Sequence, residues 1–206
     1  MRYKLWAAAL LLWTSPSSAT NSVDEALYSV FHDLYRASWL ERAMGEVTRL
    51  GDVRFQLALC AGMAAYGRDY DRDSARLHLT ALTGSGAVVY MLKRLVGRSR
   101  PERPKCKDSF PSGHSAAVWA CASIFAHRYP KYRWAYCATA SLVSFSRVYL
   151  GKHYPSDVLF GAAIGYGVAE LVWHYRDRIR ELRLSLIHIS EPTRPLYISY
   201  AVFCLK

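Results

Sequence analysis

The sequence has few cysteines, and their placement limits the chemistry that the protein can perform. Five cysteines occur in 206 residues, and no two of them form a CxxC pair. Zinc ribbons and thiol redox centres depend on such pairs, so the sequence argues against both classes. Cys60, Cys121 and Cys137 stand in apolar runs, where we expect them to be buried. Cys106 stands in a polar loop and is the candidate for a disulfide.

Acidic residues are also scarce, at 16 against 27 lysines and arginines, which gives a formal net charge of +11. Basic proteins bind nucleic acids, membrane surfaces or anionic substrates. The excess is concentrated in residues 93–107, where only Glu102 opposes the lysines and arginines. No basic stripe interleaved with aromatic residues and no zinc-finger spacing accompanies it. The sequence therefore favours a bound anion and argues against a nucleic-acid partner.

Long hydrophobic runs are absent as well. The apolar cores run for roughly 10 to 17 residues, shorter than the about 20 that a membrane-spanning helix needs. This length favours a soluble bundle or one bound peripherally to a membrane. The segment GAAIGYGVAE at 161–170 has the small residues that membrane bundles use for close packing, so an integral protein is the alternative.

Residues 1–19 have the pattern of a secretory signal. Arg2 and Lys4 supply positive charge, Trp6–Trp13 is a short apolar run, and Ser17–Ala19 offers small residues for cleavage. An uncleaved N-terminal membrane segment is the alternative. Either interpretation places the protein in the cell envelope, periplasmic or exported.

Residues 184–206 resemble the in-frame translation of sequencing adapters, LSLIHISEPTR followed by PLYISYAVFCLK. We expect this segment to be a library artefact, and we assign no function to His188 or Cys204.

Apolar residues make up 52% of the chain, and their spacing is helical. We expect one helix or a pair over 21–50, and further helices over 53–66, 75–96, 113–127, 132–148 and 157–183. A charged connector is expected at 68–76, and no series of strands or internal repeats is present. The sequence thus predicts an all-α fold, a single bundle of about six helices with polar clusters at helix ends and in loops.

Two of these clusters lie in the first half of the segment 93–157. Lys93 ends a predicted helix and Arg100–Pro101 follows in a basic loop, so both cations can neutralise phosphoryl oxygens. The alternative is a solvated loop, which is our interpretation of five other residues. These are Arg94, Arg98, Arg103, Lys105 and Lys107.

The second cluster is Pro111-Ser112-Gly113-His114, at a predicted helix start. Free backbone N–H groups and the positive end of the helix dipole favour an anion there. Gly113 permits close approach, Ser112 can cap the helix and donate a hydrogen bond, and His114 can supply a proton. A capped helix with a surface histidine is the alternative.

The third cluster places Arg147, His153 and Asp157 at short intervals. A carboxylate that accepts from one imidazole nitrogen leaves the other as a directed nucleophile, so we expect Asp157 to bond His153. Arg147 can bind an anion with two donors. Alternatively, Asp157 only caps its helix and His153 lines a loop.

Together, the three clusters resemble the signature of the type 2 phosphatidic acid phosphatase and vanadium haloperoxidase superfamily. The pattern is Lys-x6-Arg-Pro, then Pro-Ser-Gly-His, then Ser-Arg-x5-His-x3-Asp, and Lys93, Ser146 and the residues named above match every position. The resemblance covers roughly residues 50 to 175 and implies a phosphatase domain at 20–183.

The resemblance implies hydrolysis of a phosphomonoester without a metal or other cofactor, through a phosphohistidine on His153. It also implies that Asp157 orients His153 and that His114 protonates the leaving oxygen. The phosphoryl oxygens would be held by Lys93, Arg100, Ser112, the Gly113 N–H and Arg147. Expected partners are a lipid phosphate or small phosphate ester and a membrane surface, with vanadate as an inhibitor.

Two other functions fit parts of the pattern. A vanadate-dependent haloperoxidase would hold vanadate in the same site and oxidise halide. A non-catalytic module that binds anions or membranes would use the cations alone, but the presence of nucleophile and acid groups argues against it.

Overall fold

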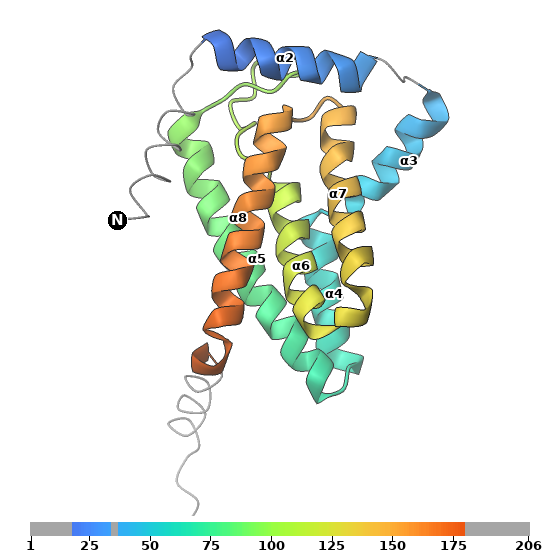
Figure 1. Cartoon of the computed structure of the whole chain (residues 1–206), viewed down its shortest axis with the longest axis vertical. Helices are drawn as coiled ribbons and strands as arrows, with labels where there is room; N and C mark the ends of the chain where they lie inside the picture. Colours follow the sequence, from blue (N-terminus) through green and yellow to red (C-terminus); the bar gives the residue numbers. More distant parts are fainter. Residues whose placement is uncertain (1–17, 34–36, 180–206) are drawn as a thin grey trace, which may run out of the picture. The chain divides into compact units, whose positions relative to one another are not determined.

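The structure, a computed structural model, describes residues 18–33 and 37–179. Within these ranges it contains seven α-helices, one 3-10 turn and a short helical stretch at 176–179, and no strand, which confirms the predicted all-α fold (Figure 1). The helices are α2 (Ser18–Asp33), α3 (Ser38–Arg49), α4 (Val53–Tyr66), α5 (Asp69–Val96), α6 (Gly113–Arg128), α7 (Arg133–Tyr149) and α8 (Pro155–His174), with the 3-10 turn η1 at Pro130–Tyr132. Residues 1–17 of the predicted leader and the whole adapter-like segment at 184–206 lie outside the described residues.

The predicted charged connector at 68–76 is wrong, because α5 already begins at Asp69. The Asp71 carboxylate accepts a hydrogen bond from the Arg68 N–H, at 3.1 Å, and so caps the first turn. Ser74 faces inward and accepts from Nε of the buried Arg128, at 2.7 Å. The alternating charges at 68–76 therefore belong to the first turns of α5. The inner face of these turns is hydrogen-bonded to the buried Arg128.

The last predicted helix also ends earlier than expected. It was predicted to run from 157 to 183, whereas α8 ends at His174 and Tyr175 forms a turn. Residues 176–179 are helical again and belong to a separate short unit that begins at His174.

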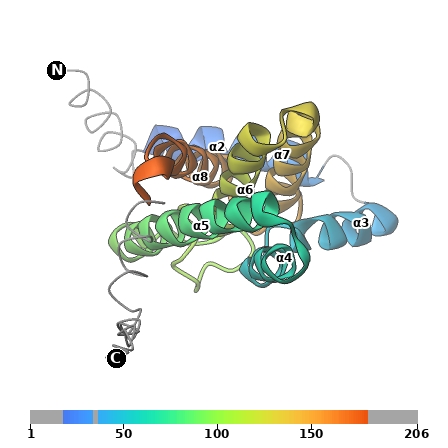
Figure 2. The same ribbon diagram turned by 90° about the horizontal axis from the view of Figure 1, so that it is seen from below.

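Helix α6 is the central helix, with α4, α5, α7 and α8 around it (Figures 1 and 2). Most of its residues are buried, and the majority of these are small. Val118 and Ala122 of α6 pack against Ala140 and Val143 of α7 in the hydrophobic core. A central helix with small side chains lets its neighbours approach closely.

The closest approach is between α8 and α6. A Cβ atom added to Gly165 would lie 2.1 Å from the Ala116 carbonyl oxygen, and one added to Gly161 would lie 2.3 Å from the Ser112 carbonyl oxygen. Both distances are far inside van der Waals contact, so only glycine fits. This contact fixes α8 against the start of α6, where the Pro-Ser-Gly-His turn lies.

Helix α2 lies across the end of the bundle where α7 ends and α8 begins (Figure 1). His32 Nδ1 donates to the Tyr149 carbonyl at 2.9 Å, and Asp24 accepts from the Ser156 N–H at 3.1 Å. The N-terminal region therefore covers the loop that carries His153.

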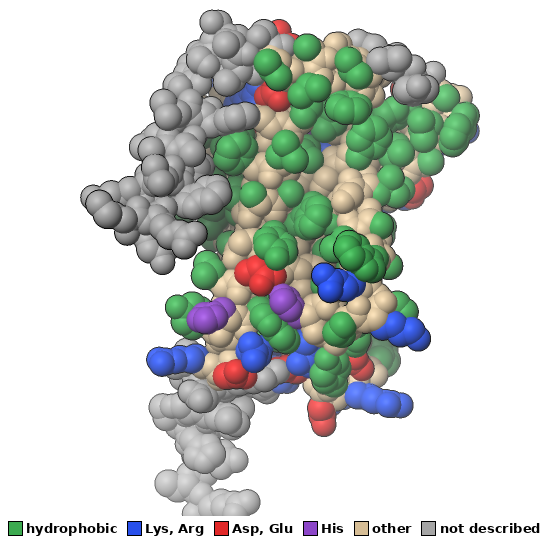
Figure 3. All heavy atoms as spheres, in the orientation of Figure 1, with side chains coloured by type: hydrophobic (Ala, Val, Ile, Leu, Met, Phe, Trp, Pro, Cys, Tyr) green, Lys and Arg blue, Asp and Glu red, His purple; other side chains and the backbone are tan. Residues whose placement is uncertain are grey.

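Large hydrophobic side chains remain exposed on the outer faces of the bundle, as Figure 3 shows over α7 and α8. Those on α5, α7 and α8 include Val88, Met91, Leu95, Leu142, Phe145, Leu159 and Leu171. Among the described residues, α8 alone has both the length and the mean hydropathy, 1.2, of a candidate membrane span.

We expect Gly165→Ala to separate α8 from α6, because the added methyl group has no space beside the Ala116 carbonyl. The free energy of unfolding should fall by about 1–3 kcal/mol, the usual cost of overpacking. Gly167→Ala, on the same helix, meets nothing within 4 Å and serves as the matched control. Denaturant or thermal unfolding would measure both, and equal stability of the two variants would contradict the close packing.

Candidate active site

The three predicted clusters meet at one end of the bundle. Lys93 lies in the last turn of α5, His114 in the first turn of α6, Arg147 in the last turn of α7, and His153 in the loop before α8. The charges of Lys93, Arg100 and Arg147 act on both histidines. The structure thus places two histidines within the field of the same three cations.

His153 is held in one tautomer by a backbone carbonyl. Its Nδ1 lies 2.7 Å from the Ser109 carbonyl oxygen, and the side chain is 2% exposed. A carbonyl only accepts hydrogen bonds, so Nδ1 carries the proton and Nε2 carries the lone pair. The unprotonated Nε2 is the atom that can act as a nucleophile.

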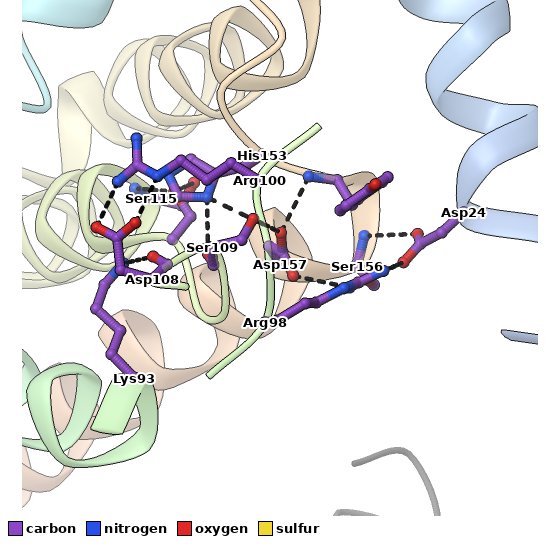
Figure 4. Close-up of polar contacts among 12 residues, drawn as sticks. Asp24, Lys93, Arg98, Arg100, Asp108, Ser109, Ser115, His153, Ser156 and Asp157 are labelled. Carbon is purple, nitrogen blue, oxygen red and sulfur yellow. Dashed lines mark hydrogen bonds and ion pairs between the residues drawn. The ribbon is translucent and has the colours of Figure 1, made fainter. Parts of the chain in front are cut away.

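Asp157 does not bond His153 directly, contrary to the sequence prediction. Its Oδ2 lies 3.9 Å from His153 Nδ1, beyond hydrogen-bond distance. Oδ2 instead accepts from Ser109 Oγ at 2.5 Å and from the Tyr154 N–H at 3.0 Å. Ser109 therefore links the two residues, since its carbonyl holds His153 and its hydroxyl holds Asp157 (Figure 4).

Arg98 is part of this network, and the prediction that it lies in the solvated loop is wrong. Its side chain is 21% exposed and donates to Asp157 Oδ1 at 2.8 Å and to Asp24 Oδ2 at 2.7 Å. Its guanidinium also lies 4.3 Å from the centre of the Tyr154 ring. Figure 4 shows Arg98 between the two carboxylates. The other four residues assigned to that loop, Arg94, Arg103, Lys105 and Lys107, are exposed.

Asp108 positions the two cations of the first cluster. Its carboxylate accepts two hydrogen bonds from Arg100, each 2.8 Å long, and its backbone carbonyl accepts one from Lys93 Nζ. The Arg100 hydrogen bonds lower the pKa of Asp108, so its carboxylate stays charged. Arg100 and Lys93 are thereby fixed beside each other through one loop residue.

Arg147 is buried and has one unused donor. Its Nη1 donates to Thr48 Oγ1 at 3.0 Å, whereas its Nε has no hydrogen-bond partner among the described residues. A buried donor without a partner costs free energy that a bound acceptor can recover. An anion placed among the three cations would supply that acceptor.

The start of α6 completes the anion-binding surface. Ser112 is fully buried and caps the helix, as predicted, and its N–H donates to the Asp157 carbonyl at 2.9 Å. A Cβ atom on Gly113 would meet only Val89, at 3.8 Å, so the backbone here is open to a ligand. The glycine and the helix N-terminus together favour close contact with an anion.

His114 packs against the turn before α4. A Cβ atom on Gly51 would lie 3.2 Å from His114 Cβ, and the carboxylate of Asp52 opposes the charges of the three cations at His114. Asp52 was not identified from the sequence.

Four residues that hold this arrangement together or act on its charge were not identified as site residues from the sequence: Asp24, Asp52, Asp108 and Ser109. Asp108 and Ser109 stand just before Pro111, and this nearness was the only signal in the sequence.

The donor set is suited to an anion. The charges of two guanidinium groups and an ammonium group act on His153, whose Nε2 is unprotonated, and the start of α6 adds a helix N-terminus. Groups of these types can bind and transfer a phosphoryl group. Within residues 18–33 and 37–179, no three His, Cys, Asp or Glu side chains are grouped to hold a metal ion.

Comparisons with known proteins agree with this geometry. The family model described as PAP2 superfamily matches residues 74–181. Phosphatidylglycerophosphatase B of Bacillus subtilis is 32% identical over 81% of this chain and 90% of its own length. Lipid A 1-phosphatase of Rhizobium etli is 39% identical, but the match covers 42% of this chain and 43% of that protein, so it spans less than half of the relative.

A solved structure is also similar. It is the crystal structure of the first transmembrane PAP2 type phosphatidylglycerolphosphate phosphatase from Bacillus subtilis, with a TM-score of 0.68 and 29% identity. The match covers 84% of this chain and 96% of that one.

The pH dependence of nucleophilic attack follows from His153. Burial, then the charges of Arg147, Lys93 and Arg100, lower its pKa well below the ordinary 6.5. Attack requires the neutral imidazole, so on the acid side the reactivity of His153 is lost only as the pH falls through this lowered pKa. We expect kcat/KM to show the ionisation of the substrate, near about 6 for a phosphate ester, and no enzyme ionisation at 6.5 or above on the acid side. An acid limb centred at 6.5 or higher after correction for the substrate would contradict the assignment.

Removal of Arg98 should leave the buried carboxylate of Asp157 without its cation. We expect Arg98→Ala to lower the free energy of unfolding by about 2–4 kcal/mol. Arg94→Ala is the control, because Arg94 is exposed and its hydrogen bond goes to the exposed Tyr90. Chemical denaturation of both variants measures the difference, and a loss below 1 kcal/mol for Arg98→Ala would count against the network.

Proposed function

The chain belongs to the PAP2 superfamily, and we propose that it is a cell-envelope phosphatase that hydrolyses a lipid phosphate through a phosphohistidine. The proposed domain covers residues 20–183. The observation that carries the proposal is the state of His153. Its Nδ1 proton is committed to the Ser109 carbonyl, so its Nε2 lone pair is available beside three cations.

In the first step, His153 Nε2 attacks phosphorus and the bond from phosphorus to the leaving oxygen breaks. Burial and the charges of the cations lower the pKa of His114 to about 4 in the free site. The negative charge of a bound phosphate ester raises that pKa again, so that His114 can carry and donate a proton to the leaving oxygen and the product leaves as a neutral alcohol. The phosphoryl oxygens are held by Lys93, Arg100, Arg147, Ser112 and the N–H of Gly113. Asp108 holds Lys93 and Arg100, and Ser112 is held as the cap of α6, which supports the proposal because fixed donors are a condition for effective electrostatic stabilisation.

In the second step, water attacks the phosphohistidine. His114, now neutral, accepts a proton from that water, phosphate is released and His153 Nε2 recovers its lone pair. Asp157 acts in both steps by favouring the positive charge that His153 carries as a phosphoimidazolium. The Ser109 carbonyl keeps the ring oriented throughout. The proposal requires no metal or other cofactor.

A lipid substrate is supported by the relatives and by the surface of the bundle. The Bacillus subtilis relative is named for phosphatidylglycerophosphate, and the Rhizobium etli relative for lipid A. Exposed apolar side chains line the outer helices, and α8 has the length and hydropathy of a membrane span. We therefore favour membrane association, integral or peripheral, with the site at an envelope surface.

We expect the purified chain to hydrolyse dodecyl phosphate and p-nitrophenyl phosphate in excess EDTA, and vanadate to inhibit it competitively. His153→Ala should lose at least about a thousandfold in kcat, because it removes the nucleophile. Radiolabelled substrate should leave an acid-labile, alkali-stable phosphoryl group on the wild-type chain and none on this variant. His127→Ala, at the far end of α6, is the control and should retain activity. Full activity of His153→Ala, or dependence on a metal ion, would exclude the mechanism.

A further inference from the structure

A cavity of about 310 Å³ opens beside the proposed phosphate site. Gly113 and His114 form part of its wall, so it adjoins the groups that would hold and protonate a phosphate ester. The rest of the wall comes from the turn before α4, the C-terminal half of α5 and the next turn of α6. Its lining includes Asp52, Val53, Leu82, Gly86 and Val89.

We propose that this cavity is a leaving-group pocket, which receives the neutral alcohol of a lipid phosphomonoester and, through Asp52, disfavours a lipid diphosphate. The inference rests on the proposed function and deepens it, because it concerns the same site. It adds which ester class the enzyme prefers and which residues select it.

The direction of the displacement indicates which part of the substrate enters the cavity. In an in-line displacement the leaving oxygen lies opposite the nucleophile, here opposite His153 Nε2. The general acid must reach the leaving oxygen, so that oxygen lies beside His114. The alcohol attached to it continues away from His153. His114 lines the cavity, and the alcohol therefore has space to enter there.

The lining indicates what kind of alcohol fits. Val53, Leu82 and Val89 present apolar side chains, and Gly86 leaves room, since a Cβ atom on it would meet nothing within 4 Å. At about 30 Å³ for each water-sized group, the volume holds on the order of ten non-hydrogen atoms. The pocket thus fits the part of a lipid alcohol next to the phosphate, and longer chains extend out of it.

Asp52 sets the charge of the pocket. Its Oδ1 accepts from the Arg54 N–H at 2.8 Å, which caps α4. The charged groups that act on His114 are Asp52, Arg147, Arg100 and Lys93, and the three cations are those assigned to the transferred phosphoryl group. A diphosphate would place its second phosphate in the pocket beside the Asp52 carboxylate, and like charges repel. An alcohol meets no such repulsion.

The first test fills the pocket. Gly86→Leu adds a side chain at the wall of the cavity, and we expect kcat/KM for dodecyl phosphate to fall at least about tenfold as pocket contacts are lost. The inhibition constant of vanadate, which has no alcohol, should change less than twofold. Gly62→Leu is the matched control: it is also a helical glycine with nothing within 4 Å, but it faces a different groove. It should behave as the wild type.

Three results of this test overturn the pocket. They are an unchanged kcat/KM in Gly86→Leu, an equal loss in Gly62→Leu, and a parallel weakening of vanadate inhibition in Gly86→Leu. If the wild type hydrolyses neither dodecyl phosphate nor p-nitrophenyl phosphate, the phosphatase function fails first. The two failures are therefore distinguishable.

The second test removes the charge and keeps the helix cap. Asp52→Asn retains the oxygen that accepts from Arg54, since asparagine caps helices as well as aspartate does. We expect methylenediphosphonate, a diphosphate analogue that is not hydrolysed, to inhibit this variant about fivefold more strongly than the wild type. Inhibition by inorganic phosphate should change less than twofold. Binding of an inhibitor involves no leaving-group protonation, so an effect of Asp52 on His114 does not confuse the result. Equal inhibition of both proteins by the diphosphonate would refute the selectivity.

Discussion

The buried carboxylate of Asp157 is the constraint on which the site depends. Asp157 is fully buried, and an unpaired charge there would be strongly destabilising. Arg98 supplies the opposing charge from the loop after α5, and Ser109 and the Tyr154 N–H satisfy the other oxygen. To reach Asp157, the loop must fold back over the start of α8. This path brings the Ser109 carbonyl to His153, so the pairing of one charge orients the proposed nucleophile.

Close backbone packing makes that arrangement rigid. Gly161 and Gly165 bring α8 into contact with the backbone of α6, and the Ser112 N–H bonds the Asp157 carbonyl at 2.9 Å. The carboxylate of Asp157 and the anion-binding turn of α6 are therefore connected through a few bonds. A helix N-terminus acts on an anion only over short distances, since its effect falls off within the first turn. Gly161 and Gly165 therefore keep the first turn of α6 in close contact with α8 and with Asp157.

The fold was predicted from the sequence because it depends on local patterns, and the eight candidate site residues are a prediction drawn from patterns of the same kind. Helical spacing of apolar residues and three short motifs are visible over a few positions. Arg98 was misassigned since its partner Asp24 lies 74 positions away, and one arginine in a basic run resembles the next. The start of α5 was missed for a similar reason, as Arg128, the buried partner of Ser74, lies 54 positions on. Only the fold brings such pairs together.

The pairing of Arg100 with Asp108 has a consequence for how an anion enters. In the structure Asp108 holds two donors of Arg100, so an arriving phosphate meets an arginine already fixed in direction. Fixing a flexible cation in advance reduces the entropy lost on binding. Asp108 also removes part of the positive charge, which weakens the attraction for any anion. Within the part of the chain that the structure describes, no carboxylate is hydrogen-bonded to Arg147, and its buried Nε has no partner. A bound oxygen atom therefore gains most free energy from a hydrogen bond to Arg147. This residue lies at the end of α7, the helix before the loop that carries His153.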